Sequence, residues 1–429
     1  MRKSGSPMIA LPFQCVEAFF ALFAGHFPPG MFQIMTEAVL ALFLEYKRCS
    51  FSAMARKTGR KCQNLQYFLA ESKWDDLQQI NQTRLQFIYS RRATRPTRRG
   101  VNVLDDTGNP KRSARHTEGV AKQYCGATKN TERCHVIVFS AYADASKHFP
   151  VHFRTYKPSS LFKDGEQNPE FHSKIDIAAD FLRGIAGDPV LPRKVVADCW
   201  YAAVKLIELA VSLGLTYISE IRSNRLLLFR HPQTRQPVYI NAEELVKLIR
   251  VHFRDKVKYV RCPTAENPTR KVPVYSFESR LQDCHVPVKV VAVLDKLFED
   301  DEESARILFS TDPKADAQEI VDDYRLRWGI ERVFAELKDL FYFDQYQTPR
   351  LKATERYWML CILDWTLAYY LKQTGALRRT VTVPQETLSG VVTAVRAVLE
   401  RQRHVRLVSL PPEQAYGIRS QRVLKRLAA

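Results

Sequence analysis

Several features that define common classes of protein are missing from this chain of 429 residues. Its nine cysteines are scattered, and no two have CxxC spacing, so neither a disulfide framework nor a zinc cluster is predicted. Reduced thiols and an intracellular location fit this pattern. No glycine-rich phosphate loop is present, which argues against an ATP-driven motor. Internal repeats and long low-complexity tracts are also missing, so a solenoid or an extended disordered protein is not expected.

The chain also lacks a long apolar run without charge near its N-terminus. The apolar segment Met8–Phe27 contains Glu17 and has no small-residue cleavage site. We therefore expect a buried helix there, and neither a signal peptide nor a membrane span. No membrane partner is predicted.

Acidic residues are few relative to basic ones. The chain has 46 Asp and Glu against 65 Lys and Arg, which gives a net charge of +19 and a pI near 9.5. A protein this basic usually binds a polyanion, most commonly nucleic acid, and a generic basic surface is the alternative. With 45% hydrophobic residues, the chain can form two or three domains with their own cores.

Residues 1–90 have a helical pattern with a candidate DNA-binding motif inside it. Phe51–Lys57 and Lys61–Ala70 are short helices separated by a turn at Thr58–Gly59, which is helix-turn-helix spacing. An ordinary helical hairpin has the same spacing, so both interpretations stay open. Base and phosphate contacts would come from polar residues around the start of the second helix, namely Arg60, Lys61, Gln63 and Asn64.

A short basic segment, residues 91–100, follows the helical region. It holds five arginines and no acid, so we expect an extended linker that can follow a phosphate backbone. A solvated hinge is the alternative, and the two roles are compatible. The five are Arg91, Arg92, Arg95, Arg98 and Arg99.

From residue 101 to 223, strands alternate with helices, which predicts an α/β domain with parallel strand pairs. Val101–Leu104 is a strand that leads into a turn starting at Asp105 and Asp106. Lys194–Ala197 is a second strand, and it ends at Asp198. Sites in such sheets lie at the carboxyl ends of strands, so these acids are candidate site residues.

The remaining chain divides by pattern into three parts. Residues 224–311 contain short strands interrupted by prolines, which indicates a β-rich insertion. Residues 312–372 return to helices and complete the α/β domain. Residues 373–429 form a basic C-terminal region.

The segment Asp322–Leu340 has one glycine and no proline, and its periodicity predicts a single helix. At about 100° per residue, Tyr324, Arg327, Glu331 and Lys338 fall within an arc of roughly 60° on one face. A surface helix with an Arg327–Glu331 ion pair is the alternative interpretation. Glu336 lies roughly 120° away from this stripe, so we expect it to be solvated.

Three acids in a basic chain suggest metal-dependent phosphodiester chemistry. They are Asp198, Glu331 and either Asp105 or Asp106. Mg²⁺ and Mn²⁺ prefer carboxylate oxygens, and two such ions about 4 Å apart activate a nucleophile and stabilise a leaving oxygen. Without metal these carboxylates would repel one another, and at least one pKa would rise.

These residues resemble a known family. The spacing of Tyr324, Arg327, Glu331 and Lys338 is similar to the Y-R-E-K signature of bacterial insertion-sequence DDE transposases. The stretches 105–111 and 119–126 resemble the first acidic block of the DDE superfamily endonuclease type, and 196–201 resembles the second. The resemblance implies a ribonuclease H-like catalytic core, interrupted by the β-rich insertion, with a helical N-terminal DNA-binding domain.

The resemblance also implies roles for these residues. Asp105, Asp198 and Glu331 would ligate two Mg²⁺ or Mn²⁺ ions per active site. Asp105 fits the family's Asp-x-Thr pattern better than Asp106, yet the pattern of residues leaves both open, because a central strand is buried on both sides. The phosphate contacts at the transposon end would come from Tyr324, Arg327 and Lys338.

The activity implied is that of a DNA transposase. It would bind the inverted repeats at transposon ends, cleave double-stranded DNA by two-metal hydrolysis and join the 3′-hydroxyl to target DNA. The resemblance further implies a homodimer on DNA, in the cytoplasm of a prokaryote and associated with the nucleoid. A structure-specific nuclease of the same fold without strand transfer, and a domesticated DNA-binding repressor, are the alternatives.

Overall fold

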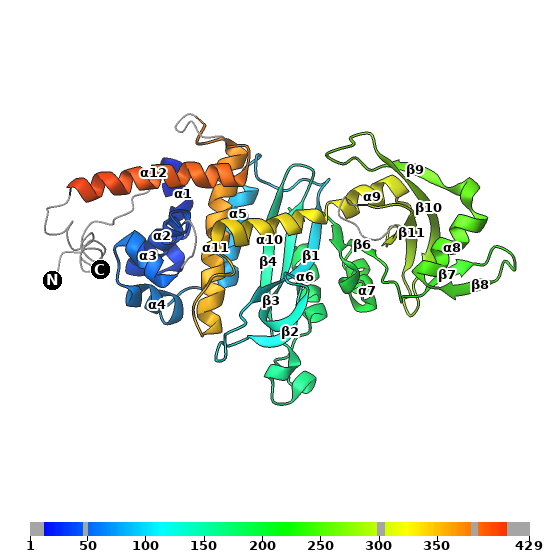
Figure 1. The fold of residues 1–429 in the computed structure, drawn as a ribbon, viewed down its shortest axis with the longest axis horizontal. Coiled ribbons are helices and arrows are strands. Elements are labelled where there is room, and N and C mark those ends of the chain that lie inside the picture. The colour runs from blue at the N-terminus through cyan, green and yellow to red at the C-terminus, as the bar shows by residue number, and fades with distance from the viewer. Residues whose placement is uncertain (1–12, 46–49, 298–304, 379–384, 410–429) are drawn as a thin grey trace, which may run out of the picture. The chain divides into compact units, whose positions relative to one another are not determined.

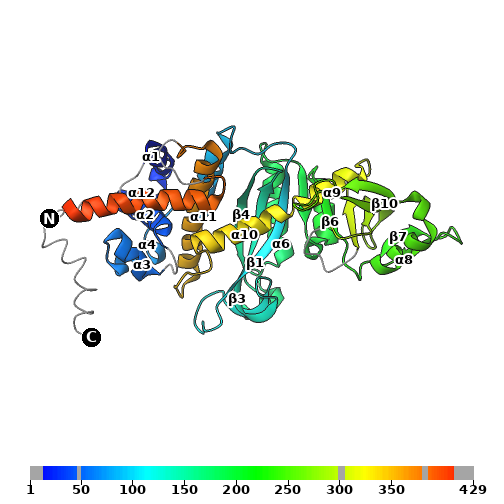
Figure 2. The ribbon, with the colours of Figure 1, turned by 45° about the horizontal axis from the view of Figure 1, so that its top comes forward.

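A computed structural model shows the protein as two compact units (Figure 1 and Figure 2). It describes residues 13–45, 50–297, 305–378 and 385–409. The helical unit comprises residues 1–95, 113–119 and 334–429, and the sheet unit comprises residues 96–112 and 120–333. Residues 334–372 were expected to belong with the α/β core, but their contacts place them with the N-terminal helices.

The helical unit is built around α11, a helix of 24 residues that is buried along most of its length. Buried residues lie on all sides of α11, and α2, α4, α5 and α12 pack against it (Figure 1). This explains why residues 334–372 group with the N-terminal helices. The helices wholly within this unit are α1 (Gln14–Ala21), α2 (Pro29–Phe43), α3 (Phe51–Thr58), α4 (Cys62–Ala70), α5 (Leu77–Tyr89), α11 (Leu351–Thr374) and α12 (Leu388–Ser409).

The apolar N-terminal segment is not one continuous helix. Residues 8–12 of it lie outside the described residues, and the remainder forms α1 followed by the short 3₁₀ helix η1 (Ala24–His26). Val16, Phe19 and Phe20 of α1 are buried. Within the described part of the chain, no helix is long and apolar enough to cross a membrane.

The predicted pair of short helices is present as α3 and α4. Ser50 caps α3 by accepting a hydrogen bond from the backbone N–H of Ala53, and Gly59 ends the helix in the left-handed conformation at φ 73°. The segment 91–100, by contrast, forms turns and is not extended. The buried hydroxyl of Thr94 donates to the carbonyl of Ile88, and this contact folds the segment back on α5.

The sheet unit contains a ten-stranded mixed sheet in the order β2-β3-β1-β5-β6-β12-β11-β10-β9, with β4 paired to β3. The pairs β1–β5 and β5–β6 are parallel. A separate ribbon is formed by β7 and β8. The strands are β1 (Val101–Pro110), β2 (Ala121–Cys125), β3 (Asn130–Ala143), β4 (His148–Tyr156), β5 (Lys194–Ala197), β6 (Thr216–Glu220), β7 (Leu227–Arg230), β8 (Pro237–Ile240), β9 (Lys258–Arg261), β10 (Lys271–Arg280), β11 (Pro287–Val293) and β12 (Arg306–Ser310).

The β-rich segment 224–311 does not form a sheet of its own. Its last strand, β12, pairs antiparallel with β6, so β9 to β12 continue the core sheet. A strand edge carries unpaired N–H and C=O groups, and β12 satisfies those of β6. The segment also contains a helix that was not predicted, α8 (Ala242–His252), which Asn241 caps.

Strand β1 extends further than predicted. The turn expected from Asp105 onward is strand, because β3 accompanies β1 over all ten residues from Val101 to Pro110. The parallel pairing with β5 is shorter and ends where Leu104 faces Ala197. Asp105 and Asp198 are the next residues on the two strands, so they leave the parallel pairing at the same level of the sheet.

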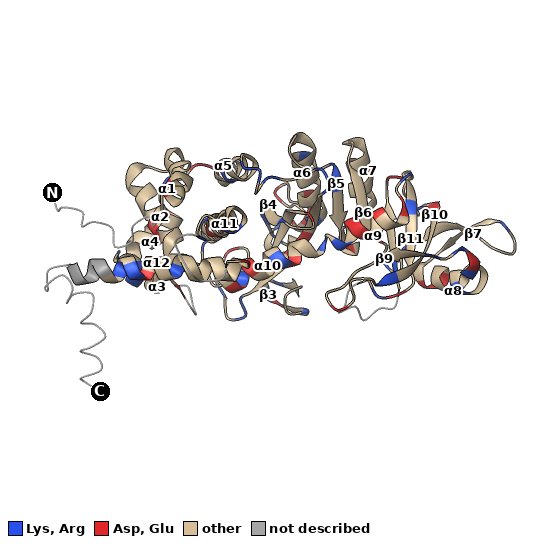
Figure 3. Cartoon of the chain, turned by 90° about the horizontal axis from the view of Figure 1, so that it is seen from above, with Lys and Arg blue, Asp and Glu red and all other residues tan. Residues whose placement is uncertain are grey.

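Four helices accompany the sheet or begin beside it. α6 (Lys174–Gly187) and α7 (Val204–Ser212) pack against each other (Figure 3). α9 packs against β12, β6 and β9. α10 begins in the sheet unit and continues into the helical unit.

The predicted single helix over residues 322–340 is wrong, because the chain bends at Leu326 and Arg327. α9 (Ala317–Arg325) ends there and α10 (Trp328–Phe341) begins. At the bend, the N–H of Arg327 bonds the carbonyl of Tyr324, three residues back, at 3.0 Å. The first turn of α10 then lies against the end of β3, where a Cβ on Gly329 would stand 2.6 Å from the Cβ of Ala143. Tyr324 is therefore on a different helix from Glu331 and Lys338, and the four residues share no single stripe.

The close approach at Gly329 predicts that Gly329→Ala destabilises the protein. The new methyl group would overlap Ala143, so we expect a loss on the order of 1–3 kcal/mol, measured by thermal or urea unfolding. Gly187→Ala at the end of α6 is the matched control, because no atom lies within 4 Å of its added Cβ. Equal stability of the two variants would contradict this account of the bend.

Candidate active site

Two carboxylates meet where the parallel pairing of β1 and β5 ends. Asp198 follows β5 directly and caps the 3₁₀ helix η4 (Cys199–Tyr201), accepting hydrogen bonds from the N–H groups of Trp200 at 3.0 Å and Tyr201 at 3.3 Å. Asp105 lies on β1 with only 13% of its side chain exposed. The carboxyl edge of neighbouring parallel strands is where α/β sheets place ligands.

A third carboxylate, that of Glu331, is linked to Asp105 by an arginine that pairs with both. The Arg327 guanidinium, at the bend between α9 and α10, lies 3.3 Å from Asp105 Oδ2 and 3.3 Å from Glu331 Oε1. Only 14% of the Arg327 side chain is exposed, against 40% for Glu331. Basic and acidic residues both occur along α9 and α10 (Figure 3). The structure thus links Asp105 to Glu331 through Arg327, and it also contains the Arg327–Glu331 ion pair of the alternative interpretation.

The electrostatics of the cluster show a shortage of positive charge. Burial raises the pKa of Asp105 well above its usual range, and the charge of Asp198 raises it further. Burial also raises the pKa of Asp198 to about 6, although Arg327 opposes the shift. Burial alone would lower the pKa of Arg327, but the neighbouring Tyr324 and Asp105 raise it, so the guanidinium stays charged. One cation therefore does not balance these acids.

Asp106 is held on the other side of β1. Its Oδ2 accepts a hydrogen bond from Lys174 Nζ, and its Oδ1 accepts one from the Tyr201 hydroxyl, both at 2.9 Å. Successive side chains alternate between the faces of a strand, so only one of two adjacent acids can point toward Arg327. That residue is Asp105.

Tyr324, predicted to contact phosphate, is buried with 1% of its surface exposed. Its hydroxyl donates to Glu220 Oε2 at 2.9 Å, and Arg306 Nη1 lies 2.5 Å from the same oxygen. In this structure Tyr324 is therefore a support for the bend and is closed to direct phosphate contact. Sequence reasoning missed Glu220 and Arg306, although an acid at the end of β6, beside β5, was a usable signal.

Lys338, the last residue of the predicted stripe, and Glu336 lie further along α10, in the helical unit. Lys338 is half-buried there. Glu336, expected to be solvated, accepts a hydrogen bond from Trp365 Nε1 at 2.9 Å. That prediction was wrong because a polar atom of the core helix α11 needs a partner on the face of α10 that carries Glu336.

The candidate DNA-binding residues of the helical unit differ in exposure. Lys61, Gln63 and Asn64 are exposed around the start of α4. Arg60 is partly buried, and its guanidinium bonds the buried carboxylate of Glu37. Its Nη2 donates to Glu37 Oε1 at 3.0 Å. Arg60 therefore ties the helix pair to α2.

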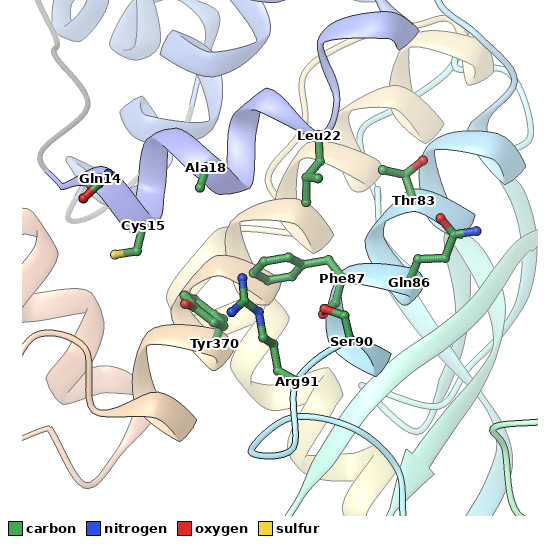
Figure 4. Close-up of a pocket in the computed structure, with 10 residues that line it drawn as sticks. All are labelled: Gln14, Cys15, Ala18, Leu22, Thr83, Gln86, Phe87, Ser90, Arg91 and Tyr370. Carbon is green, nitrogen blue, oxygen red and sulfur yellow. The ribbon is translucent and has the colours of Figure 1, made fainter.

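The arginines of the segment 91–100 are all exposed. Arg91 lies over the ring of Tyr370, 6.0 Å from its centroid. Figure 4 shows Arg91 beside Phe87 and Tyr370 at a hollow of about 570 Å³ in the helical unit. No carboxylate lines this hollow, so it offers no ligands for a hard metal ion.

The raised pKa of Asp198 predicts how stability depends on pH. An unfolded Asp loses its proton near pH 4, whereas folded Asp198 keeps it to about pH 6, so stability falls as pH rises through this window. Asp198→Asn removes the effect. In metal-free buffer, its unfolding free energy relative to the unsubstituted protein should increase by on the order of 2 kcal/mol between pH 4 and pH 7. If the difference in unfolding free energy between the two proteins does not change with pH, the raised pKa of the buried Asp198 is contradicted.

The fold and these acids define a class of protein: α/β proteins with carboxylates at the carboxyl edge of parallel strands. The model of the DDE superfamily endonuclease family matches residues 27–244, and that of the transposase DDE domain matches residues 172–367. The first match covers more than half of the chain, so the chain belongs to the DDE superfamily endonucleases. No curated protein matches the chain in a sequence comparison.

A solved structure shares the fold. The piggyBac transposase, in a synaptic complex with hairpin DNA, superposes with a TM-score of 0.51 at 11% identity, over 94% of this chain and 84% of that one. At this identity the likeness shows the fold alone. The predicted mixed α/β class is confirmed by the large mixed sheet and by this similarity.

Proposed function

We propose that the chain is a DNA transposase with a ribonuclease H-like catalytic core. It binds the inverted repeats at the ends of a bacterial insertion sequence, cleaves there and joins the freed 3′-hydroxyl to target DNA. One observation carries this proposal. Asp105 and Asp198 lie together where the β1–β5 pairing ends, and Arg327 forms ion pairs with both Asp105 and Glu331. Membership of the DDE superfamily endonucleases and the match to a transposase DDE domain support it.

The donor set fits divalent metal ions. Asp105, Asp198 and Glu331 would hold two Mg²⁺ or Mn²⁺ ions, because all three offer hard carboxylate oxygens, and the raised pKa values of Asp105 and Asp198 indicate missing positive charge. When bound, such ions activate the attacking hydroxyl and stabilise the leaving oxygen. Among the described residues, no three His, Cys, Asp or Glu side chains are already close enough to hold a metal. The site therefore has to rearrange, and the partly exposed Glu331 is the acid with room to move.

Arg327 is the residue whose contacts change in this proposal. Its planar guanidinium is always charged and matches the geometry of phosphate oxygens. When a DNA phosphate enters, Arg327 can turn from Glu331 to that phosphate, which leaves the Glu331 carboxylate free. Tyr324 acts through Glu220 and holds the bend that carries Arg327. Lys338, further along α10, is proposed as a second phosphate contact.

The basic residues outside the site would hold the DNA. Lys61, Gln63 and Asn64 are exposed around the start of α4, and the five arginines of the segment 91–100 are exposed as well. Cationic side chains that neutralise phosphates supply most of the sequence-independent affinity for DNA. Two protomers on two ends would form a homodimer on the double-stranded DNA, in the prokaryotic nucleoid.

A joining assay tests this function. The purified protein is incubated in Mg²⁺ with labelled duplexes that carry the inverted repeats flanking its gene, and with a supercoiled target plasmid. We expect a nick at the repeat boundary and labelled strand joined to the plasmid. Cleavage without joined product would indicate a nuclease of the same fold. Binding without cleavage would indicate a repressor, and either result would overturn the transposase.

A further inference from the structure

Tyr201, the last residue of η4, is buried beside the candidate metal ligands and is bonded to several parts of the sheet. Only 1% of it is exposed. A tyrosine that leaves water needs a partner for its hydroxyl, and that of Tyr201 donates to Asp106 Oδ1 on β1 at 2.9 Å. The proposed metal site makes no direct use of Tyr201, so these contacts require an explanation of their own.

The backbone of Tyr201 is held as firmly as its side chain. Its N–H donates to Asp198 Oδ1 at 3.3 Å, and its carbonyl accepts from the Tyr217 hydroxyl on β6 at 2.8 Å. Ser219, also on β6, donates its hydroxyl to the carbonyl of Asp198 at 2.9 Å. The turn that starts at Asp198 is therefore bonded to β6 through its backbone, and to β1 through the Tyr201 hydroxyl.

Asp106 is a fixed anchor for that hydroxyl. Its other oxygen accepts a hydrogen bond from Lys174 Nζ at 2.9 Å, and only 13% of the Asp106 side chain is exposed. Because Asp105 directly precedes Asp106 on β1, a bond to Asp106 also fixes the part of the strand that carries Asp105. The two adjacent acids thus have different contacts, since Asp105 faces Arg327 and Asp106 holds η4.

We propose that Tyr201 is a positioning residue, which sets the separation of the Asp105 and Asp198 carboxylates by linking Asp106 to the turn that starts at Asp198. Two carboxylates close together repel each other before a metal arrives, so a restraint that does not depend on metal keeps them in place. Outer groups that orient metal ligands typically change metal affinity by roughly 10- to 100-fold when they are removed. The inference rests on the proposed function, because it assumes that Asp105 and Asp198 bind metal.

Binding of Mn²⁺ to the full chain tests this role. The electron paramagnetic resonance signal of free Mn²⁺ is followed as protein is added without DNA, so the result does not depend on cleavage. Tyr201→Phe keeps the ring and removes only the hydroxyl, and we expect it to weaken Mn²⁺ binding by about tenfold. Asp105→Asn should abolish the binding, which shows that the signal reports this site.

The metal dependence of cleavage gives a second measurement. In Tyr201→Phe, the Mg²⁺ concentration that gives half the maximal cleavage rate should rise by about tenfold, while the rate at saturating Mg²⁺ should change less than about twofold. When Asp106→Ala is already present, adding Tyr201→Phe should weaken Mn²⁺ binding little further, because the hydroxyl has lost its acceptor.

Tyr142→Phe is the matched control. Tyr142 is fully buried in the sheet unit, and its hydroxyl also donates to an aspartate, Asp144 Oδ2, at 2.6 Å. It lies opposite Asn102 near the start of β1, away from the candidate ligands. Tyr142→Phe should lower the thermal midpoint about as much as Tyr201→Phe and leave Mn²⁺ binding unchanged. A merely structural role of Tyr201 would make the two variants alike in both measurements.

Mn²⁺ binding by Tyr201→Phe that equals that of Tyr142→Phe would overturn the positioning role, and so would an unsubstituted protein that binds no Mn²⁺. Cleavage, measured separately, distinguishes the two hypotheses. If cleavage depends on Glu331 but Mn²⁺ binding does not depend on the Tyr201 hydroxyl, the positioning role fails and the transposase stands. If Mn²⁺ binding depends on that hydroxyl while no DNA is cleaved, the positioning role stands and the transposase fails.

Discussion

Glu331→Gln is expected to abolish DNA cleavage in Mg²⁺, by about a thousandfold or more, which corresponds to about 4 kcal/mol of transition-state stabilisation. The amide keeps the shape of the side chain but removes the charge that a divalent ion requires. Single-turnover cleavage of a labelled inverted-repeat duplex measures the effect. Asp105→Asn and Asp198→Asn should give losses of similar size, and combining two substitutions should add little, because the three acids act as a unit.

The matched control lies on the same helix. Asp339 is exposed on α10, so Asp339→Asn removes the same charge without touching the site. It should cleave at the rate of the unsubstituted protein. The DNA footprint of Glu331→Gln should also be unchanged, because the acid contributes to chemistry and not to holding the DNA. Cleavage by Glu331→Gln at an undiminished rate would contradict the assignment of Glu331.

Arg327→Gln has the second large expected effect, and it concerns stability in the absence of metal. The substitution leaves Asp105 beside Asp198 and without the Arg327 cation that opposes their repulsion. Removing one partner of a largely buried charge pair typically costs 3–5 kcal/mol, and because Glu331 is partly exposed we expect about 2 kcal/mol at pH 8. Mn²⁺ should restore much of this loss, so the increase in thermal midpoint on adding Mn²⁺ should be larger in the variant.

Arg332→Gln is the control for that experiment. Arg332 is exposed on α10, five residues after Arg327. Its substitution should change neither the stability nor the response to Mn²⁺. The contradicting result is a thermal midpoint that is lower in Arg327→Gln but rises no more with Mn²⁺ than that of the unsubstituted protein. It would mean that Arg327 and the metal do not neutralise the same carboxylates.

Local patterns were sufficient to predict several elements of both units. The strand before Asp198, the short helices α3 and α4, and the core helix α11 follow from runs of apolar residues and from turn residues beside them. The bend at Leu326 could not be predicted in this way. It depends on the contact of Gly329 with Ala143, which is far away in the sequence, whereas the local periodicity favours a continuous helix.

The pairing of the strands also could not be predicted from local patterns. Prolines and short strands predicted a β-rich segment over residues 224–311, and β7 to β12 lie there together with α8. Whether that segment forms its own sheet depends on whether β12 pairs with β6, and no local feature decides such a pairing. The same holds for residues 334–372, which group with the N-terminal helices because α11 needs cover on every side.

The choice between Asp105 and Asp106 shows the limit most clearly. Both acids sit in one strand, and the residues around them are compatible with either orientation. The contacts that distinguish the two side chains come from elsewhere in the chain: Arg327 contacts Asp105, whereas Lys174 and Tyr201 contact Asp106.

The central claim is that Asp105, Asp198 and Glu331 together hold divalent metal, and anomalous scattering from crystals grown with Mn²⁺ and inverted-repeat DNA measures this directly. We predict anomalous peaks within bonding distance of all three carboxylates, with Arg327 turned away from Glu331 and toward a phosphate. Peaks at other residues, or none at these acids in crystals of protein that cleaves DNA with Mn²⁺, would contradict the account.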